Sequence, residues 1–125
     1  MRIVHQALVA LAGLLGICGV ASAALSAHMP DNPMFGIIAP ILMIHAASVV
    51  AVVALSVAQG GRGALDFSAA LLGIGAALFS AAVLLPTYGR SLFPMAAPTG
   101  GMLMMAGWLW LSVAVVLGLA RSRQG

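Results

Sequence analysis

Charge is what this sequence lacks most. Of its 125 residues only five arginines and two aspartates are charged, and there is no lysine. Four long runs, at 3–30, 32–61, 67–89 and 91–120, contain no charged residue at all. The charged residues between and beside these runs are Arg2, Asp31, Arg62, Asp66, Arg90, Arg121 and Arg123. A helix needs about 20 residues to cross the hydrocarbon core, and an ionised side chain there costs at least about 2.5 kcal/mol. The distribution therefore predicts an integral membrane protein with four spans.

The scarcity of carboxylates and cysteines excludes other classes of protein. The four-span topology places Asp31 and Asp66 on opposite sides of the membrane, so they cannot form a paired acid and base. Cys18 is the single cysteine, which excludes an intrachain disulfide. The arginines are scattered at helix ends and do not suggest nucleic-acid binding. Since no nucleophile–base pair stands out, we expect a protein that is not an enzyme and has no cofactor.

The apolar runs predict four helices near residues 4–27, 36–59, 67–86 and 98–120. The connections between them are short and rich in proline, glycine and polar residues, which is typical of turns. They leave no room for a soluble module. We therefore predict one domain over residues 1–125, an all-α, integral membrane, antiparallel four-helix transmembrane bundle.

The first apolar run also has features of a secretory signal, because Ala21-Ser22-Ala23 imitates a cleavage site. Cleavage there would leave three spans. Apolar residues continue through Ala27, however, and Gly13, Gly16 and Gly19 are more typical of a packing face than of a signal core. We expect this helix to be retained.

The arginines also predict how the chain is oriented. In a four-span protein the two termini and the second connection share one side, which holds Arg2, Arg62, Arg121 and Arg123. The other side holds only Arg90. Because positive residues are enriched in cytoplasmic loops, we expect both termini in the cytoplasm and the protein in a bacterial inner membrane.

Small residues predict where the helices pack. Lipid tails are as apolar as leucine, so membrane helices associate through close backbone contact. Gly16 and Gly19 lie on one face of the first helix, and Gly73 lies in the third. Gly100 and Gly101 allow a close approach to the fourth helix, for which the first helix near Gly19 is the expected partner. Such faces serve either ordinary bundle packing or a homodimer seam.

A few polar side chains lie deep within the predicted spans. His45 is the only titratable nitrogen well inside one, and an ionisable residue at that depth suggests a functional site. Cys18, Ser80 and Trp108 are expected at similar depth. His45 is expected to bond Ser80, or Ser48 one turn along its own helix. The alternative is a role in handling protons or a ligand, while Trp108 is a candidate partner surface.

Methionines gather in the half of the protein predicted to lie outside. The seven internal ones are Met29, Met34, Met43, Met95, Met102, Met104 and Met105. Thioethers with an imidazole suit Cu(I), which makes His28, Met29, Met95 and Met102 a candidate soft-metal site. The alternative is that methionine serves as a flexible apolar filler where helix ends splay.

Four segments together carry a family resemblance. They are Ser26-Ala27-His28, His45-Ala46-Ala47, Leu78-Phe79-Ser80, and Pro98-Thr99-Gly100-Gly101 followed by Gly107-Trp108. Their order resembles the domain of unknown function 423 family of small four-span membrane proteins, which includes YgdD-like proteins and animal transmembrane protein 256. The likeness covers nearly the whole chain. It implies an inner-membrane protein with an uncleaved first helix, and it brings no catalytic or ligand role.

The sequence thus favours a non-enzymatic inner-membrane protein that assembles with itself or with a larger membrane complex. Its expected partners are the lipid bilayer and either a second copy or another membrane subunit. The alternative is binding or transport of a small solute or a copper-like soft metal ion through the outer Met/His region.

Overall fold

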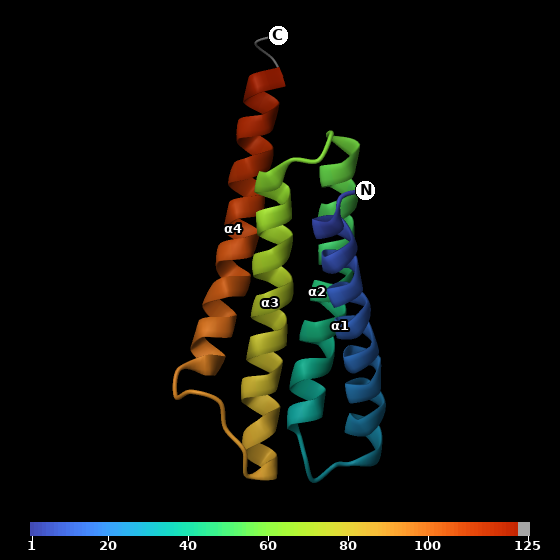
Figure 1. Ribbon diagram of the computed structural model, residues 1–125. Coiled ribbons are helices and arrows are strands. Elements are labelled where there is room, and N and C mark those ends of the chain that lie inside the picture. The colour runs from blue at the N-terminus through green and yellow to red at the C-terminus, as the bar shows by residue number, and fades with distance from the viewer. Residues whose placement is uncertain (123–125) are drawn as a thin grey trace.

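The computed structural model describes residues 1–122, which form four antiparallel α-helices and one short 3-10 helix (Figure 1). The elements are α1 (Ile3–His28), α2 (Met34–Ala58), α3 (Gly63–Leu84), the 3-10 helix η1 (Leu85–Tyr88) and α4 (Ala96–Ser122). Within the described residues, four helices are long and apolar enough to cross a membrane. The predicted all-α, four-helix transmembrane architecture is confirmed, and the chain is described below as a multi-pass membrane protein.

All four helices begin earlier than predicted, by one to four residues, and the largest difference is at the start of the third. The prediction started the third helix after Asp66, on the ground that a charge marks a membrane boundary. In the structure α3 begins at Gly63 and takes Asp66 into its first turn, where other polar side chains surround the carboxylate. The fourth helix begins at Ala96 and includes Pro98, which is tolerated because the first turn has no N–H partner to lose.

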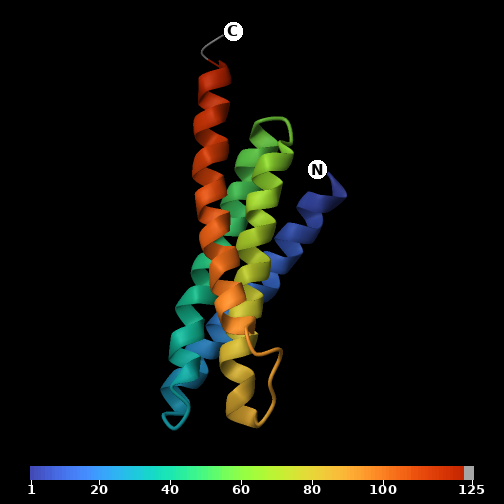
Figure 2. The same ribbon diagram turned by 90° about the vertical axis from the view of Figure 1, so that its left-hand side faces the viewer.

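The helices follow one another across the bundle. The N-terminus, the α2–α3 connection and the C-terminal end of α4 lie at one end, which we call the N-terminal end (Figure 1). The α1–α2 connection and η1 lie at the opposite end. α2 packs along α1 and α3, while α1 crosses obliquely and lies beside α3 over a shorter stretch (Figure 2). Over the described residues, the α4 backbone lies beside α3 alone.

Two apolar clusters form the core. The cluster nearer the N-terminal end is built from α1, α2 and α3 around Val49, Ala69 and Leu72, none of which is exposed. The second cluster, nearer the opposite end, centres on Ile38 and Ala76. Both clusters join side chains from three helices, so they fix α1, α2 and α3 as one packed unit.

Glycines set the spacing of α1 against its neighbours. A Cβ atom on Gly19 would lie 3.1 Å from the backbone nitrogen of Met43 in α2. A Cβ on Gly73 would lie 2.8 Å from the side chain of Leu11 in α1. Gly16 is less crowded, since its nearest neighbour would be 3.9 Å away. Close approach therefore depends on Gly19 and Gly73 more than on Gly16.

The close contact of Gly100 differs from the expected one. A Cβ on Gly100 would lie 2.5 Å from the backbone nitrogen of Phe79, so this glycine packs against α3 and not against α1 near Gly19. The reason is that α4 lies beside α3, while α1 lies beside α2 and α3. Gly101 meets only the ring of Phe79, at 4.0 Å.

Two further glycines, not predicted from the sequence as packing residues, complete the contact between α3 and α4. A Cβ on Gly75 would lie 2.8 Å from the backbone nitrogen of Met104, and one on Gly107 would lie 3.1 Å from that of Leu72. Gly75, Gly100 and Gly107 thus let the two backbones touch along their length. We call these three residues the α3–α4 glycine seam.

Candidate functional site

The densest group of polar side chains surrounds Asp66, at the N-terminal end of the bundle. The Asp66 side chain is only 8% exposed. The Ser56 hydroxyl donates a hydrogen bond to its Oδ1 atom over 2.6 Å, and Nε2 of His5 lies 3.1 Å from the same atom. The Arg2 guanidinium forms an ion pair with Oδ2. We call Arg2, His5, Ser56 and Asp66 the Asp66 cluster.

The local sequence explains how these groups meet. The carboxylate of Asp66 lies in the first turn of α3, where the helix dipole favours negative charge. The α2–α3 connection turns tightly at Gly60 and Gly61, both with a φ of 81°. This turn directs the Gly61 carbonyl toward Arg2, whose guanidinium donates a 2.7 Å hydrogen bond to it. The start of α1 is thereby tied to the α2–α3 hairpin.

The proton positions in the cluster follow from its hydrogen bonds. Nε2 of His5 lies 3.1 Å from the Asp66 Oδ1 atom, which can only accept, and 3.3 Å from the Arg2 guanidinium, which can only donate. The backbone N–H of Arg2 points at Nδ1 over 3.4 Å, so the tautomer that satisfies both ring nitrogens accepts at Nδ1 and donates from Nε2 to the nearer carboxylate. The single hydroxyl proton of Ser56 has two acceptors within reach, the Asp66 carboxylate at 2.6 Å and the Arg62 carbonyl at 3.1 Å. The carboxylate is nearer and charged, so it is the stronger acceptor.

This arrangement does not amount to a nucleophilic site. A serine nucleophile needs a base that accepts its proton, and that base is usually a histidine. Here Ser56 and His5 both donate to Asp66, so no base activates the hydroxyl. The cluster instead satisfies a buried carboxylate with a cation and two neutral donors, which is the chemistry of a structural anchor.

His45 makes neither of the hydrogen bonds predicted for it. Its Nδ1 atom donates to the Ile41 carbonyl over 2.8 Å, and its Nε2 atom is buried without a partner. Ser48 instead donates to the Ile44 carbonyl of its own helix. His45 packs at an angle of 65° against Trp108 of α4, with ring centroids 6.1 Å apart. The prediction was wrong because His45 and Ser48 each bond a carbonyl one turn back in their own helix.

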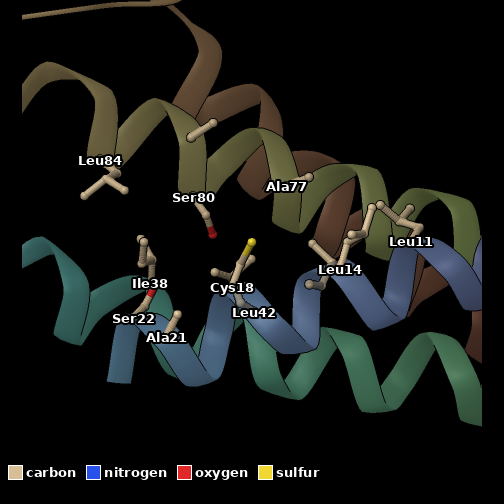
Figure 3. A pocket seen from close by; sticks show the side chains of 12 residues that line it. Leu11, Leu14, Cys18, Ala21, Ser22, Ile38, Leu42, Ala77, Ser80 and Leu84 are labelled. Atoms are coloured by element: carbon tan, nitrogen blue, oxygen red, sulfur yellow. The ribbon is translucent and has the colours of Figure 1, made fainter. Parts of the chain in front are cut away.

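Ser80 and Cys18, predicted at similar depth, do share a site. Both line a cavity of about 490 Å³ bounded by α1, α2 and α3. Ser80 is only 5% exposed, and its hydroxyl has no hydrogen-bond partner. Figure 3 shows Ser80 pointing from α3 into the space that Cys18 enters from α1.

The structure does not bring the predicted soft-metal residues to one place. His28 is exposed at the end of α1, and Met29 is exposed in the connection that follows. Met95 and Met102 are exposed just before and within α4, which does not lie beside α1. Among the described residues no group of three or more histidine, cysteine or acidic side chains could hold a metal ion.

Arg121 and Arg123, which contributed to the predicted orientation, lie beyond the residues whose side chains the structure describes. Trp110, about three helical turns nearer the centre of α4, is described. Its indole N–H donates to the Ala64 carbonyl over 3.0 Å, and its ring meets Phe67 edge-on. These contacts add to those of the α3–α4 glycine seam.

Comparisons of the chain with protein-family models, with curated proteins and with solved structures found no match. The resemblance to the domain of unknown function 423 family therefore stays a prediction. What the chain does has to be argued from its own geometry.

Sequence reasoning missed the Asp66 cluster although its parts were visible. It placed Arg2 and Arg62 on one side of the membrane, and the same topology puts His5 and Asp66 there. When a carboxylate and an imidazole lie at helix ends on the same side of the membrane, the two are expected to pair with each other, since each is costly to bury alone. Ser56 gave no such signal, because a serine in an apolar helix usually bonds its own backbone.

Proposed function

We propose that this chain is a non-enzymatic membrane protein that works by assembling, through α4, with another membrane-embedded helix. The observation that supports this is the one-sided packing of α4, whose backbone lies beside α3 alone in the described part of the chain and which meets α2 through the Trp108–His45 ring pair. In the spanning window of α4 17% of the residues are buried, against 28% in α1 and 39% in α2 and α3. α4 therefore offers the largest uncovered helix face.

Exposure alone does not distinguish a partner from lipid, since both cover apolar side chains. Trp108 supplies the distinction. Tryptophan normally lies at the two membrane boundaries, where its N–H meets water and headgroups. Trp108 instead lies near the middle of α4 and is 42% exposed. Tryptophan is also enriched at protein interfaces. The surface formed by Met105, Trp108, Leu109 and Val116, which we call the α4 face, thus favours a protein partner, either a second copy or a subunit of a membrane complex.

Gentle purification of the tagged protein from its native membrane, followed by mass spectrometry, tests the proposal. We expect a stoichiometric partner, or a size that corresponds to more than one copy. Leu109→Trp and Val116→Trp change the shape of the α4 face without adding charge and should reduce recovery of the partner at least tenfold. Ile17→Trp is the matched control, because Ile17 is 69% exposed on α1. Recovery of a single copy, or equal loss in the control, would overturn the proposal.

We further infer that the protein lies in a bacterial inner membrane with both termini in the cytoplasm. Arg2 and Arg62 lie at the N-terminal end of the bundle, and Arg90 lies at the opposite end. In a Cys18→Ser background, a membrane-impermeant thiol reagent added to intact cells should label Ser91→Cys. It should label Gln59→Cys only after permeabilisation. The reverse pattern would place the termini outside.

A further inference from the structure

We propose that the cavity between α1 and α3 binds an elongated aliphatic molecule that is dissolved in the membrane and carries one carbonyl group. In this site Ser80 donates its hydroxyl proton to the ligand carbonyl. The proposal concerns a different surface from the α4 face, so a chain that proves to be a single copy would leave it standing.

The unpartnered hydroxyl of Ser80 is the first observation. Serines within membrane helices usually donate to the carbonyl one turn back, as Ser48 does to Ile44 and Ser112 does to Trp108. Ser80 makes no such bond, although the residue is buried and only 5% of its surface is exposed. Its oxygen points into the cavity (Figure 3). A buried hydroxyl without a partner is costly, and an acceptor on a ligand would remove that cost.

The shape of the cavity is the second observation. Its volume of about 490 Å³ is that of a small-molecule site, which usually measures about 300–1,000 Å³. It runs along α1 from Leu11 to Ser22, a distance of about 16 Å at 1.5 Å per residue. The opposite wall, from Ala77 to Leu84, belongs to α3. A long space between two helices fits an extended chain better than a compact ring system.

The walls of the cavity define the chemistry of the ligand. Among the residues whose side chains the structure describes, no charged one lines it, and Ile38 and Leu42 of α2 form its floor. A charged ligand would therefore be buried without a counter-ion, which is unfavourable. A carbonyl is neutral and has no proton of its own to donate, so one hydrogen bond from Ser80 suffices. The ligand reaches the cavity from the membrane, since Cys18 on its wall is exposed at the surface of the bundle.

The lone cysteine provides a direct test. Because Cys18 is the only thiol in the chain, its alkylation by N-ethylmaleimide in lipid nanodiscs reports occupancy of the cavity. The probes are a straight-chain methyl ketone and the alkane of equal length. We expect the ketone to slow alkylation at a concentration about fivefold lower than the alkane, which is the contribution of one neutral hydrogen bond. Ser80→Ala should abolish the difference between the two probes.

Two controls keep the result unambiguous. Ser112→Ala removes a hydroxyl that bonds its own helix and should leave the preference for the ketone unchanged. Ala81→Phe places a ring in the cavity and should remove protection by both probes. Equal protection by ketone and alkane in the unaltered chain would show that the cavity only accepts lipid tails, and the proposal would fail. A preference that survives Ser80→Ala would overturn it as well.

Discussion

The Nε2 atom of His5 lies 3.1 Å from the Oδ1 atom of Asp66, which comes 61 residues later in the chain. This contact joins the first turn of α1 to the first turn of α3. Arg2 and Ser56 complete the set of donors around the same carboxylate. The bundle therefore holds one of its two carboxylates inside a helix end, where it would be unfavourable without these partners.

The two aspartates should respond differently to neutralisation. Asp66→Asn keeps the size of the side chain but removes the charge that Arg2 and Ser56 recognise, so it should lower the free energy of unfolding by about 2 kcal/mol. Asp31→Asn is the control, because Asp31 is exposed in the α1–α2 connection. It should change stability by less than about 0.5 kcal/mol. Reversible unfolding in mixed detergent micelles measures both, and equal effects would contradict the anchoring role of Asp66.

Two of the histidines should also give opposite results. His5→Leu leaves the Asp66 carboxylate with one donor fewer and should cost about 2 kcal/mol. His45→Leu removes a buried Nε2 atom that has no partner, so it should cost less than about 1 kcal/mol or stabilise the protein. The same unfolding assay applies. A large loss of stability for His45→Leu would contradict this expectation. It would show that the Nε2 atom forms a hydrogen bond in the membrane.

The α3–α4 glycine seam should not tolerate even a methyl group. Gly100→Ala would place its Cβ atom 2.5 Å from the Phe79 backbone nitrogen, and such overpacking typically costs about 1–3 kcal/mol. Gly13→Ala is the control, since no atom lies within 4 Å of the new Cβ. It should be neutral, or stabilising by up to about 1 kcal/mol through helix propensity.

Fluorescence reports the result at the seam directly, because both tryptophans of the chain lie in α4. Gly100→Ala should shift the tryptophan emission as α4 moves from α3, and Gly13→Ala should leave it unchanged. An unshifted emission with unchanged stability for Gly100→Ala would show that the helices are not in close contact there.

A buried serine also joins these two helices, in addition to the hydrogen bond from Trp110 to Ala64. Ser68 is fully buried in α3, and its hydroxyl donates to the Gly107 carbonyl over 2.9 Å. Ser68→Ala should cost about 0.6–1 kcal/mol, as such bonds typically contribute in membrane proteins. Ser112→Ala loses only a bond within its own helix and should have no measurable effect. Thermal unfolding followed at the α4 tryptophans distinguishes the two variants.

The positions of the helices could be predicted because the membrane imposes a simple rule. Spans avoid charge, so four charge-free runs became four helices, with ends within four residues of the observed ones. The largest error, at the start of α3, arose where the rule has an exception. Asp66 enters the helix because Arg2, His5 and Ser56 satisfy its carboxylate, and these partners are distant in the sequence.

The candidate sites were harder to predict, since they depend on which helices become neighbours. Cys18 and Ser80, predicted at similar depth, line one cavity that the sequence did not predict. The partner of Gly100 was not, because nothing in a glycine pair shows whether α1 or α3 will approach it. The hydrogen bond of His45 to the Ile41 carbonyl was not predicted, because both expected partners, Ser80 and Ser48, were side chains.

The Asp66 cluster also links the stability of the bundle to the way the chain enters the membrane. Arg2 and His5 belong to the start of α1, while Ser56 and Asp66 flank the α2–α3 connection. Their contacts require all four to emerge on the same side of the bilayer. A first helix inserted in the reverse direction would place Arg2 and His5 on the opposite side of the membrane. The Asp66 carboxylate would then lie at the membrane boundary without its ion pair to Arg2. The folded bundle is thus most stable when its first helix has been inserted in this direction during synthesis.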